Sequence, residues 1–373
     1  MSGTTVVPAN SHAIVITEVI EMGGAERSCL ALARWLYEHN LPVHFVTYMD
    51  RVGLERFATH PLTVVQLKPQ MDARHKIAAM KQYFAEHSDA PKPMMSGYQP
   101  VLHATLAGMS GFHCLMHDTP SLFSDAGKQK SLKQKLSRWV SDTIVGRGLK
   151  TGGSIIVTSE YLKAETKRVF GVDAAIARMG GLAQENAFHL RPVQDKLRMF
   201  SVSRIEGNKR IDWMVRALAA IERGPNPLSR RVDWRLDIAG KGSQLEAMRA
   251  LAAELGVDGR IIFHGFVSDE DLQGLYDHAD LFLMPAVQGY GIPAIEALSR
   301  GIPVMLHRES GVSDILLDTP WATVMKGGEE AMVSTLEQAT AKVIAGTHLS
   351  QALPELPTED SWAERVARLS RWI

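Results

Sequence analysis

The segment "ADLFLMPAVQGYGIPAIEALSRGIPVMLHR", residues 279–308, decides the fold of this chain. It opens with a largely apolar run that predicts a buried strand, and residues 302–308 predict a second strand. Between them, a glycine-rich loop leads to Pro293, which suits the first turn of a helix because the N–H that proline lacks has no intrahelical partner there. Strand, loop, helix and strand in this order form the repeating unit of a parallel sheet covered by helices.

The same alternation of strands and helices runs along the whole chain. In the first half, short apolar runs predict strands at residues 12–19, 41–49, 62–67, 112–118 and 152–159. A helix predicted at 23–40 has an apolar face formed by Leu30, Ala33, Leu36 and Tyr37. A second set has strands that begin at residues 197, 233, 259 and 279, alternating with helices at 211–222, 243–257 and 268–279. Ser268 is a favourable N-cap for the last of these helices.

The two sets predict two domains. The chain has 373 residues, enough for two domains of ordinary size, and a polar stretch at 184–196 separates the sets. We therefore expect an α/β protein with Rossmann-like domains at residues 1–190 and 191–357, followed by an amphipathic helix at 358–373. Ligands bind at the carboxyl ends of strands in open parallel sheets. The chemistry is therefore expected in the loops that follow the strands, facing a cleft between the domains.

The composition restricts the class of protein. The 41 basic and 41 acidic residues cancel, so a general electrostatic attraction to nucleic acid is not expected. The two cysteines, Cys29 and Cys114, lie far apart without metal-ligand spacing, which indicates a reducing compartment. No apolar run is long enough to span a bilayer, and the first ten residues have no signal-sequence pattern. These features predict a cytoplasmic protein.

Two loops of the second half have the residues of an anion site. Gly289 and Gly291 permit close approach of a ligand to the backbone, and free amides at the start of the following helix attract anions. Glu296 is expected in the first turn of that helix, facing either the cleft or the solvent. In the alternative to a binding role, this glutamate only complements the helix dipole. Arg204 ends another strand of the same half and Lys209 follows shortly after it, so the two cations can clamp a diphosphate.

Loops of the first half add weaker signals. Residues 23–28, "GGAERS", bring two glycines to the start of a helix, but they lack the G-x-G-x-x-G pattern, so NAD binding is not supported. Residues 238–243, "IAGKGS", do not match the phosphate-binding P-loop. His117 and Asp118 follow a predicted strand, and histidine suits hydrogen bonding and proton transfer near neutral pH.

Together these motifs resemble the family-4 retaining glycosyltransferases of GT-B architecture. The resemblance rests on "GGAER", "HD", "SR" with a following lysine, "GFVSDEDLQGLYDHADLFLMPA" and "GYGIPAIEALSRGIPV", and it is strongest between residues 200 and 315. It implies two Rossmann-like domains that face each other across a deep cleft. It also implies that the last helix crosses back to the N-terminal, acceptor-binding domain.

The resemblance further implies a nucleotide-diphosphate sugar, linked to UDP or GDP, as co-substrate and no other cofactor. Arg204 and Lys209 would neutralise the leaving diphosphate, His117 would assist at the reacting centre, and Glu296 would bind the ribose hydroxyls. The other implied donor-binding positions are Gly24, Phe266, Val267, Gln288, Gly289, Tyr290, Gly291 and Ile292. Because no Asp-x-Asp motif lies in a metal-binding context, we expect catalysis without a metal ion.

Gln288 departs from the family pattern, which has a glutamate at this position and another at the position of Glu296. Glutamine keeps the hydrogen-bonding reach and adds a donor, but it loses the charge. An altered donor preference or weaker electrostatic help is therefore expected. Two other functions stay open: a nucleotide-sugar epimerase or hydrolase of the same fold, and a non-catalytic nucleotide-sugar-binding protein.

Residues 125–150 form a basic segment within an otherwise neutral chain. Apolar side chains fall at helical spacing among the lysines, so the segment is either a solvated helix with one packed face or a helix that lies on an anionic membrane. The second hypothesis implies a lipid-linked or envelope-glycan acceptor and a protein peripheral to the inner face of the plasma membrane. The residues that carry it are Lys128, Lys130, Lys133, Lys135, Arg138 and Trp139.

Overall fold

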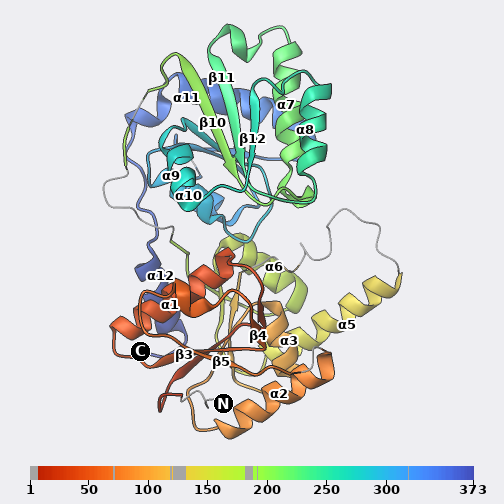
Figure 1. Cartoon of the computed structure of the whole chain (residues 1–373), viewed down its shortest axis with the longest axis vertical. Coiled ribbons are helices and arrows are strands. Elements are labelled where there is room, and N and C mark those ends of the chain that lie inside the picture. The colour runs from red at the N-terminus through yellow and green to blue at the C-terminus, as the bar shows by residue number, and fades with distance from the viewer. Residues whose placement is uncertain are drawn as a thin grey trace. The chain divides into compact units, whose positions relative to one another are not determined.

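The computed structural model describes residues 7–69, 72–117, 120, 132–180, 188–190, 192–317 and 319–373. It divides into two compact units (Figure 1). Unit 1 comprises Met1–Gly180 and Pro357–Ile373, and unit 2 comprises Gly181–Leu356. Each unit contains a parallel sheet with packed helices, so the predicted pair of Rossmann-like domains is confirmed.

Unit 1 is built on a seven-stranded parallel sheet of order β5-β3-β1-β6-β7-β8-β9. Its strands are β1 (His12–Val15), β3 (Val43–Thr47), β5 (Thr63–Gln66), β6 (Met94–Ser96), β7 (His113–Met116), β8 (Ile155–Val157) and β9 (Ala175–Ile176). A separate two-stranded sheet pairs β2 (Glu18–Val19) with β4 (Met49–Asp50). The helices are α1 (Gly24–Glu38), α2 (Ala73–Glu86), α3 (Tyr98–Leu106), α5 (Leu132–Leu149), α6 (Glu160–Phe170) and α12 (Glu359–Leu369).

Two details of unit 1 differ from the prediction. The strand expected at 12–19 is interrupted, because β1 ends at Val15 and the next two residues lead to β2 in the other sheet. The face of α1 is also narrower than expected. Leu30, Ala33 and Leu36 are buried, whereas Tyr37 lies at the edge of the apolar stripe and is exposed.

The last helix, α12, completes unit 1. It packs beside α1, and Trp362 and Val366 on its apolar face are fully buried. Arg34 of α1 holds its first turn through an ion pair of 2.6 Å with Asp360. At its other end, Ser154 Oγ donates to the Leu369 carbonyl over 2.5 Å. The expected return of the final helix to the N-terminal domain is therefore observed.

Unit 2 has a six-stranded parallel sheet of order β12-β11-β10-β13-β14-β15. Its strands are β10 (Lys196–Val202), β11 (Asp233–Ala239), β12 (Ile261–Gly265), β13 (Leu281–Met284), β14 (Val304–His307) and β15 (Ala322–Met325). The helices are α7 (Ile211–Arg223), α8 (Leu245–Glu254), α9 (Asp269–Asp277), α10 (Ile292–Leu298) and α11 (Met332–Ile344). Ser268 caps α9 as predicted, since its Oγ accepts from the Asp271 amide over 3.1 Å.

Both sheets reverse their strand order at one point. In unit 1 the chain moves from β1 through β3 to β5 on one side, and from β6 through β7 and β8 to β9 on the other. In unit 2 the corresponding reversal separates β10 from β13. At such a point the loops of two neighbouring strands leave in opposite directions and open a crevice at the carboxyl edge of the sheet. Each unit therefore has one favoured place for a ligand.

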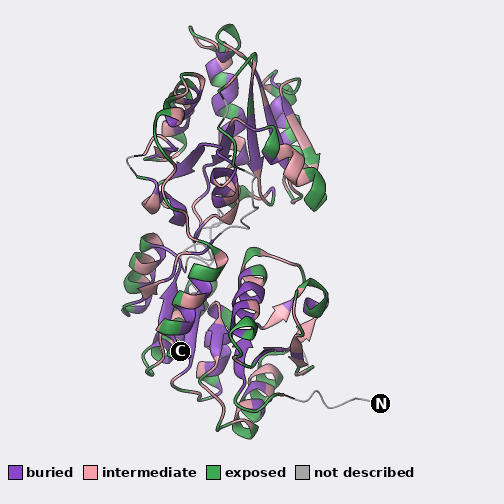
Figure 2. Cartoon of the chain, turned by 90° about the vertical axis from the view of Figure 1, so that its left-hand side faces the viewer, coloured by how far each residue is buried: buried purple, intermediate pink, exposed green. Residues whose placement is uncertain are grey.

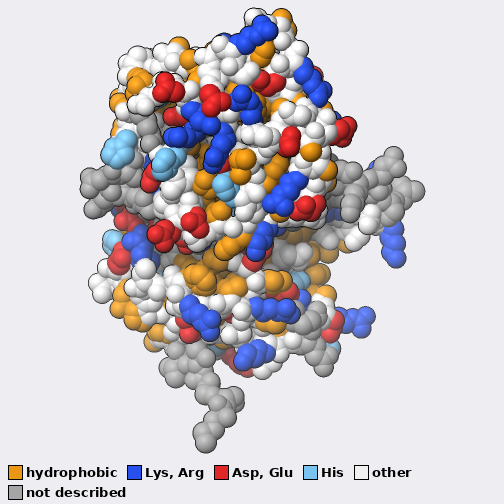
Figure 3. All heavy atoms as spheres, turned by 45° about the horizontal axis from the view of Figure 1, so that its top comes forward, with side chains coloured by type: hydrophobic (Ala, Val, Ile, Leu, Met, Phe, Trp, Pro, Cys, Tyr) orange, Lys and Arg blue, Asp and Glu red, His pale blue; other side chains and the backbone are white. Residues whose placement is uncertain are grey.

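The cores and surfaces follow the sequence pattern. Buried residues concentrate in the strands and in the helix faces that pack on them (Figure 2). Acidic and basic side chains are interspersed over the face shown in Figure 3, as the balanced composition requires. None of the described helices is long and apolar enough to cross a membrane. The first turns of α5 extend away from the neighbouring helices of unit 1 (Figure 1).

Candidate active site

The loop after β10 presents two cations at the carboxyl edge of the unit 2 sheet. Arg204 is exposed, and Lys209 ends a short 3₁₀ turn formed by Gly207–Lys209. Glu206 lies between them in sequence, but its carboxylate accepts from the Ser243 amide over 2.9 Å and from the Ser243 hydroxyl over 2.7 Å. These bonds lower the pKa of Glu206. They also keep its charge bound to Ser243 on the neighbouring loop.

Arg210 joins this loop to the loop after β13. Its φ of 57° is left-handed and ends the 3₁₀ turn, and its guanidinium lies 4.2 Å from the centre of the Trp213 ring. Nη1 of Arg210 donates to the Pro285 carbonyl over 3.0 Å. Because this bond ties the residue next to Lys209 to the end of β13, the two strand-end loops are held together.

The loop after β13 is as compact as its glycines predict. Gly291 has a φ of 121°, and a Cβ added there would lie 2.5 Å from Met284 Cε. The Tyr290 carbonyl accepts from the Val312 amide and the Ser310 hydroxyl, and the Tyr290 side chain is buried. Any donor contact of Tyr290 would therefore come from its backbone amide. Helix α10 follows directly, with Pro293 in its first turn.

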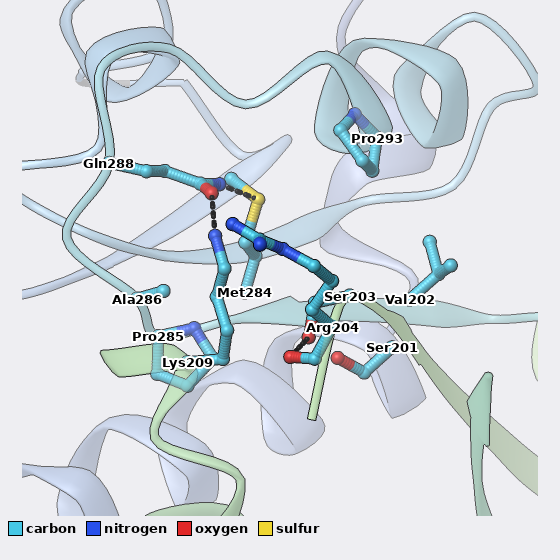
Figure 4. A pocket seen from close by; sticks show the side chains of 10 residues that line it. All are labelled: Ser201, Val202, Ser203, Arg204, Lys209, Met284, Pro285, Ala286, Gln288 and Pro293. Atoms are coloured by element: carbon cyan, nitrogen blue, oxygen red, sulfur yellow. Dashed lines mark hydrogen bonds between the residues drawn. The ribbon is translucent and has the colours of Figure 1, made fainter. Parts of the chain in front are cut away.

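The two loops enclose a pocket of about 130 Å³ at the reversal between β10 and β13 (Figure 4). Arg204, Lys209 and Gln288 point into it, and Nζ of Lys209 donates to Oε1 of Gln288 over 3.1 Å. The lining residues are Ser201, Val202, Ser203, Arg204, Lys209, Met284, Pro285, Ala286, Gln288 and Pro293. Among the described residues, two cations and no carboxylate line this pocket, so it is suited to an anion.

Glu296 lies on α10, the helix whose Pro293 lines the pocket, and a tyrosine holds its carboxylate. It is the fifth residue of α10, one turn later than predicted. The hydroxyl of buried Tyr276 donates to Oε2 of Glu296 over 3.0 Å. Burial raises the pKa of this tyrosine well above its ordinary value, so the hydroxyl keeps the proton that it donates. The guanidinium of Arg300 lies 4.7 Å from the Tyr276 ring centre and donates to the Glu296 carbonyl over 2.7 Å. The sequence prediction included neither Tyr276 nor Arg300.

The loop after β12 offers an aromatic platform on the same edge of the sheet. Phe266 is 71% exposed, and Nζ of Lys241 lies 4.6 Å from its ring centre. Val267 follows it and is half-buried. A Cβ at Gly240, whose φ is 135°, would lie 1.9 Å from the Ser203 carbonyl oxygen, so the loop that carries Lys241 needs glycine there. An exposed ring next to a cation is suited to stacking on a planar base.

The remaining predicted donor residues lie in unit 1. His117 follows β7, and its Nε2 is 3.1 Å from Ser96 Oγ, which in turn is 3.2 Å from Cys29 Sγ. Gly24 is the exposed first residue of α1, directly after a cap in which Glu26 accepts from the Gly23 amide over 3.1 Å. Asp118, the predicted neighbour of His117, lies outside the described residues.

The basic segment is only partly described, because Lys128 and Lys130 lie outside the described residues. Lys133 and Lys135 are exposed on α5. Arg138 differs, since it pairs with Asp142 at 2.9 Å and lies 4.4 Å from the Tyr98 ring centre. Its charge is therefore used within unit 1. Trp139 is 66% exposed, and Leu136 and Val140 of the same face are exposed as well.

Comparison with known proteins agrees with this geometry. The family described as glycosyl transferases group 1 matches residues 183–342, which is most of unit 2. A GDP-mannose-dependent alpha-(1-6)-phosphatidylinositol monomannoside mannosyltransferase of Mycolicibacterium smegmatis is 25% identical over 346 residues, covering 85% of this chain and 84% of the relative. An uncharacterized glycosyltransferase of Methanocaldococcus jannaschii is 33% identical over 235 residues, or 59% of this chain and 53% of that protein.

Solved structures show the same fold. WaaG, a glycosyltransferase involved in lipopolysaccharide biosynthesis, superposes with a TM-score of 0.70 at 18% identity, covering 96% of this chain and 99% of WaaG. The sequence motifs, the family match to unit 2 and the similarity in fold lead to one assignment. The chain carries a domain of the family described as glycosyl transferases group 1 at residues 183–342, and its fold is the GT-B fold of the solved glycosyltransferases.

Proposed function

We propose that this glycosyltransferase moves a hexosyl group, with retention of configuration, from a nucleotide-diphosphate sugar to a lipid-linked or glycan acceptor. The observation that carries the proposal is the pocket at the strand-order reversal of unit 2, where Arg204 and Lys209 are the charged residues among the described lining. Two cations in one pocket repel each other unless an anion lies between them. A diphosphate supplies that anion and is also the leaving group of such a donor.

The transfer breaks the bond between the anomeric carbon and the diphosphate oxygen and forms a bond to an acceptor hydroxyl oxygen. The acceptor's proton is released with the nucleoside diphosphate. Negative charge grows on the diphosphate as the bond breaks, and Arg204 and Lys209 stabilise that charge. The amides of Gly289 and Ile292 then serve the phosphate and sugar oxygens, and Glu296 the ribose hydroxyls. Retention and the role of His117 rest on the resemblance to family 4.

We propose that the reaction needs no metal ion. Magnesium binds through carboxylate oxygens and phosphates, and no carboxylate lines this pocket in the part of the chain that the structure describes. Fixed cations can supply the same stabilisation of the leaving group. GDP-mannose is the first donor to test because the relative from M. smegmatis is named as GDP-mannose-dependent.

The acceptor side of the proposal includes a membrane. Leu136, Trp139 and Val140 are exposed on one face of α5, next to Lys133 and Lys135. An exposed tryptophan between aliphatic side chains and lysines suits the interface of an anionic bilayer. We therefore propose that α5 docks unit 1 at the inner face of the plasma membrane, where a lipid-linked acceptor would be found.

The test is turnover with a panel of nucleotide sugars in excess EDTA, with octyl α-D-mannopyranoside and phosphatidylinositol vesicles as acceptors. The expected result is release of nucleoside diphosphate at the same rate with EDTA and with magnesium, together with a glycosylated product. Release that stops in EDTA would contradict metal independence. A free sugar or an epimer as the main product, or no release with any donor, would contradict glycosyl transfer.

A further inference from the structure

Unit 1 has a pocket at its own strand-order reversal. It lies where β1 and β6 part, and its volume of about 430 Å³ is in the range of about 300–1,000 Å³ found for small-molecule sites. The residues that line it are Thr17, Glu18, Ala73, Lys76, Gln99 and His103. Thr17 and Glu18 follow β1, and Gln99 is the second residue of α3, the helix after β6. The position is therefore equivalent to that of the cationic pocket in unit 2.

The chemistry of the two pockets is different. In unit 1, Lys76 and Glu18 form an ion pair whose side chains are 14% and 26% exposed. The charges cancel, so an anion entering this pocket would be repelled by Glu18, and a cation by Lys76. The partly buried pair still presents an ammonium donor and a carboxylate acceptor to the pocket. A neutral ligand that both donates and accepts hydrogen bonds fits this arrangement best.

His103 adds a second polar group with a fixed orientation. Its Nδ1 is 3.0 Å from the hydroxyl of Tyr48, which is buried. Burial lowers the pKa of His103 and raises the pKa of Tyr48, so the imidazole is neutral and the phenol keeps its proton. When the phenol donates to Nδ1, the imidazole proton lies on Nε2. That nitrogen makes no hydrogen bond to another described residue, and it is then a donor for a ligand.

Gln99 completes the set. It is exposed on the first turn of α3, and its amide makes no hydrogen bond to another described residue. One turn of helix separates it from His103, so both side chains lie on the same face. An amide, a carboxylate, an ammonium and an imidazole line one pocket and together offer both donors and acceptors. Hydroxyl groups on a ring need both, because each hydroxyl donates and accepts.

We propose that the pocket between β1 and β6 binds a neutral polyhydroxylated ring, a sugar or cyclitol unit of the acceptor. Glu18, Lys76, Gln99 and His103 are its ligands. The inference rests on the proposed glycosyl transfer and adds the acceptor's chemical class and the residues that select it. The acceptor is recognised through hydroxyl groups, and a charged group on the bound ring is disfavoured.

Saturation-transfer NMR tests this with three neutral probes, methyl α-D-mannopyranoside, methyl α-D-glucopyranoside and myo-inositol, and with glucose 6-phosphate as the anionic probe. Wild-type protein is expected to bind at least one neutral probe more tightly than the phosphate. Gln99→Ala removes one hydrogen-bonding group and should weaken that binding about fivefold. Gln82→Ala, which removes an exposed glutamine of α2, should have no effect.

Glu18→Gln gives the sharper result, because it leaves Lys76 without its counter-charge. The variant should lose affinity for the neutral probe and gain affinity for glucose 6-phosphate. Binding of no neutral probe, or neutral binding that is unchanged in Gln99→Ala and Glu18→Gln, would overturn the inference. Thermal shift with GDP and UDP on the same samples reports on unit 2. If the protein binds GDP or UDP but none of the neutral probes, only the inference about the pocket of unit 1 fails. If it binds neither nucleotide, the proposed function fails.

Discussion

Nζ of Lys209 donates a hydrogen bond to Oε1 of Gln288 over 3.1 Å, so a neutral amide holds the ammonium in place. Lys209 comes from the loop after β10 and Gln288 from the loop after β13. A glutamate at this position would also hold the lysine, but it would cancel its charge. With glutamine in place of the family's glutamate, the pocket keeps the positive charge that we propose attracts a diphosphate.

Gln288→Glu is expected to weaken binding of GDP and UDP. The new carboxylate pairs with Lys209 and repels the diphosphate, and a loss of about tenfold in affinity corresponds to about 1.4 kcal/mol. Isothermal titration with each nucleotide measures the change. Gln351→Glu adds the same charge at an exposed position of unit 2 outside the pocket and should leave affinity unchanged. Equal affinities for wild type and Gln288→Glu, with unchanged donor choice, would contradict this account of the position.

Arg204→Gln and Lys209→Gln should each lower kcat/KM by about 10²–10³, the usual effect of removing one group that stabilises developing charge. The loss should be larger in kcat than in 1/KM, because the charge on the leaving diphosphate grows during the reaction. Steady-state kinetics with a saturating acceptor separates the two. Arg249→Gln changes an exposed arginine that binds Glu246, and its rate should equal that of wild type.

Tyr276→Phe should raise the KM for the donor about fivefold while changing kcat less. The lost hydroxyl fixes Glu296, so the carboxylate becomes mobile and binds the ribose less well. A purely structural role of Tyr276 would lower the melting temperature and leave KM unchanged. Tyr37→Phe, at an exposed tyrosine of α1, is the matched control for loss of a hydroxyl.

Unit 1 should lose stability in mild acid because of a buried histidine. Burial lowers the pKa of His44 to about 4 from its ordinary value of 6.5, and its ring nitrogens bond Ser11 and Tyr83. Above pH 6.5 this histidine is neutral in both the folded and unfolded states. Between 6.5 and 4 only the unfolded chain takes up the proton, so the free energy of unfolding falls by up to about 1.4 kcal/mol per pH unit.

Urea unfolding at pH 7 and pH 5 measures this slope. His113, whose pKa burial also lowers to about 4, should contribute in the same direction. His44→Gln should be less stable at pH 7 but should show a shallower decline towards pH 5. His278→Gln, at an exposed histidine of unit 2, should keep the wild-type slope. A slope that is unaffected by His44→Gln would show that other groups cause the acid sensitivity.

The protein should float with vesicles that contain anionic lipid. Lys133→Glu/Lys135→Glu should reduce the bound fraction, since each lysine near an anionic surface contributes about 1 kcal/mol. Trp139→Ala should reduce it by removing an apolar anchor. Lys81→Glu/Lys92→Glu makes the same change of net charge elsewhere in unit 1 and should float as wild type does. Flotation that is equal in both double variants, or absent from wild type, would exclude docking through α5.

The sequence was sufficient to predict that Arg204, Lys209 and Gln288 converge, because all three follow strands of one parallel sheet. The sequence did not indicate that Tyr276 holds Glu296, and the reason is physical. Tyr276 lies on α9 and meets Glu296 of α10 only through tertiary packing, and a tyrosine within an amphipathic helix has no local pattern that indicates such a role. Arg300 is similar, since it is 2% exposed and a buried arginine is not expected from sequence alone.

The pocket of unit 1 could not be predicted for another reason. It depends on β6, whose three residues are too few for a recognisable apolar run, and on the interruption between β1 and β2. Strands of this length form because long-range pairing with β1 and β7 stabilises them, and not because of local propensity. The sequence therefore indicated the loops that form the pocket of unit 2, but not those that form the pocket of unit 1.

The return of α12 to unit 1 sets the order in which the protein can fold during synthesis. Residues 181–356 form unit 2 entirely from consecutive sequence, so this unit can complete its core as soon as it has emerged. The part of α1 that packs on α12 is covered only when Trp362 and Val366 arrive, after unit 2 has been made. The first-made unit is thus the last to be finished. Until then, the part of α1 that packs on α12 stays exposed to solvent.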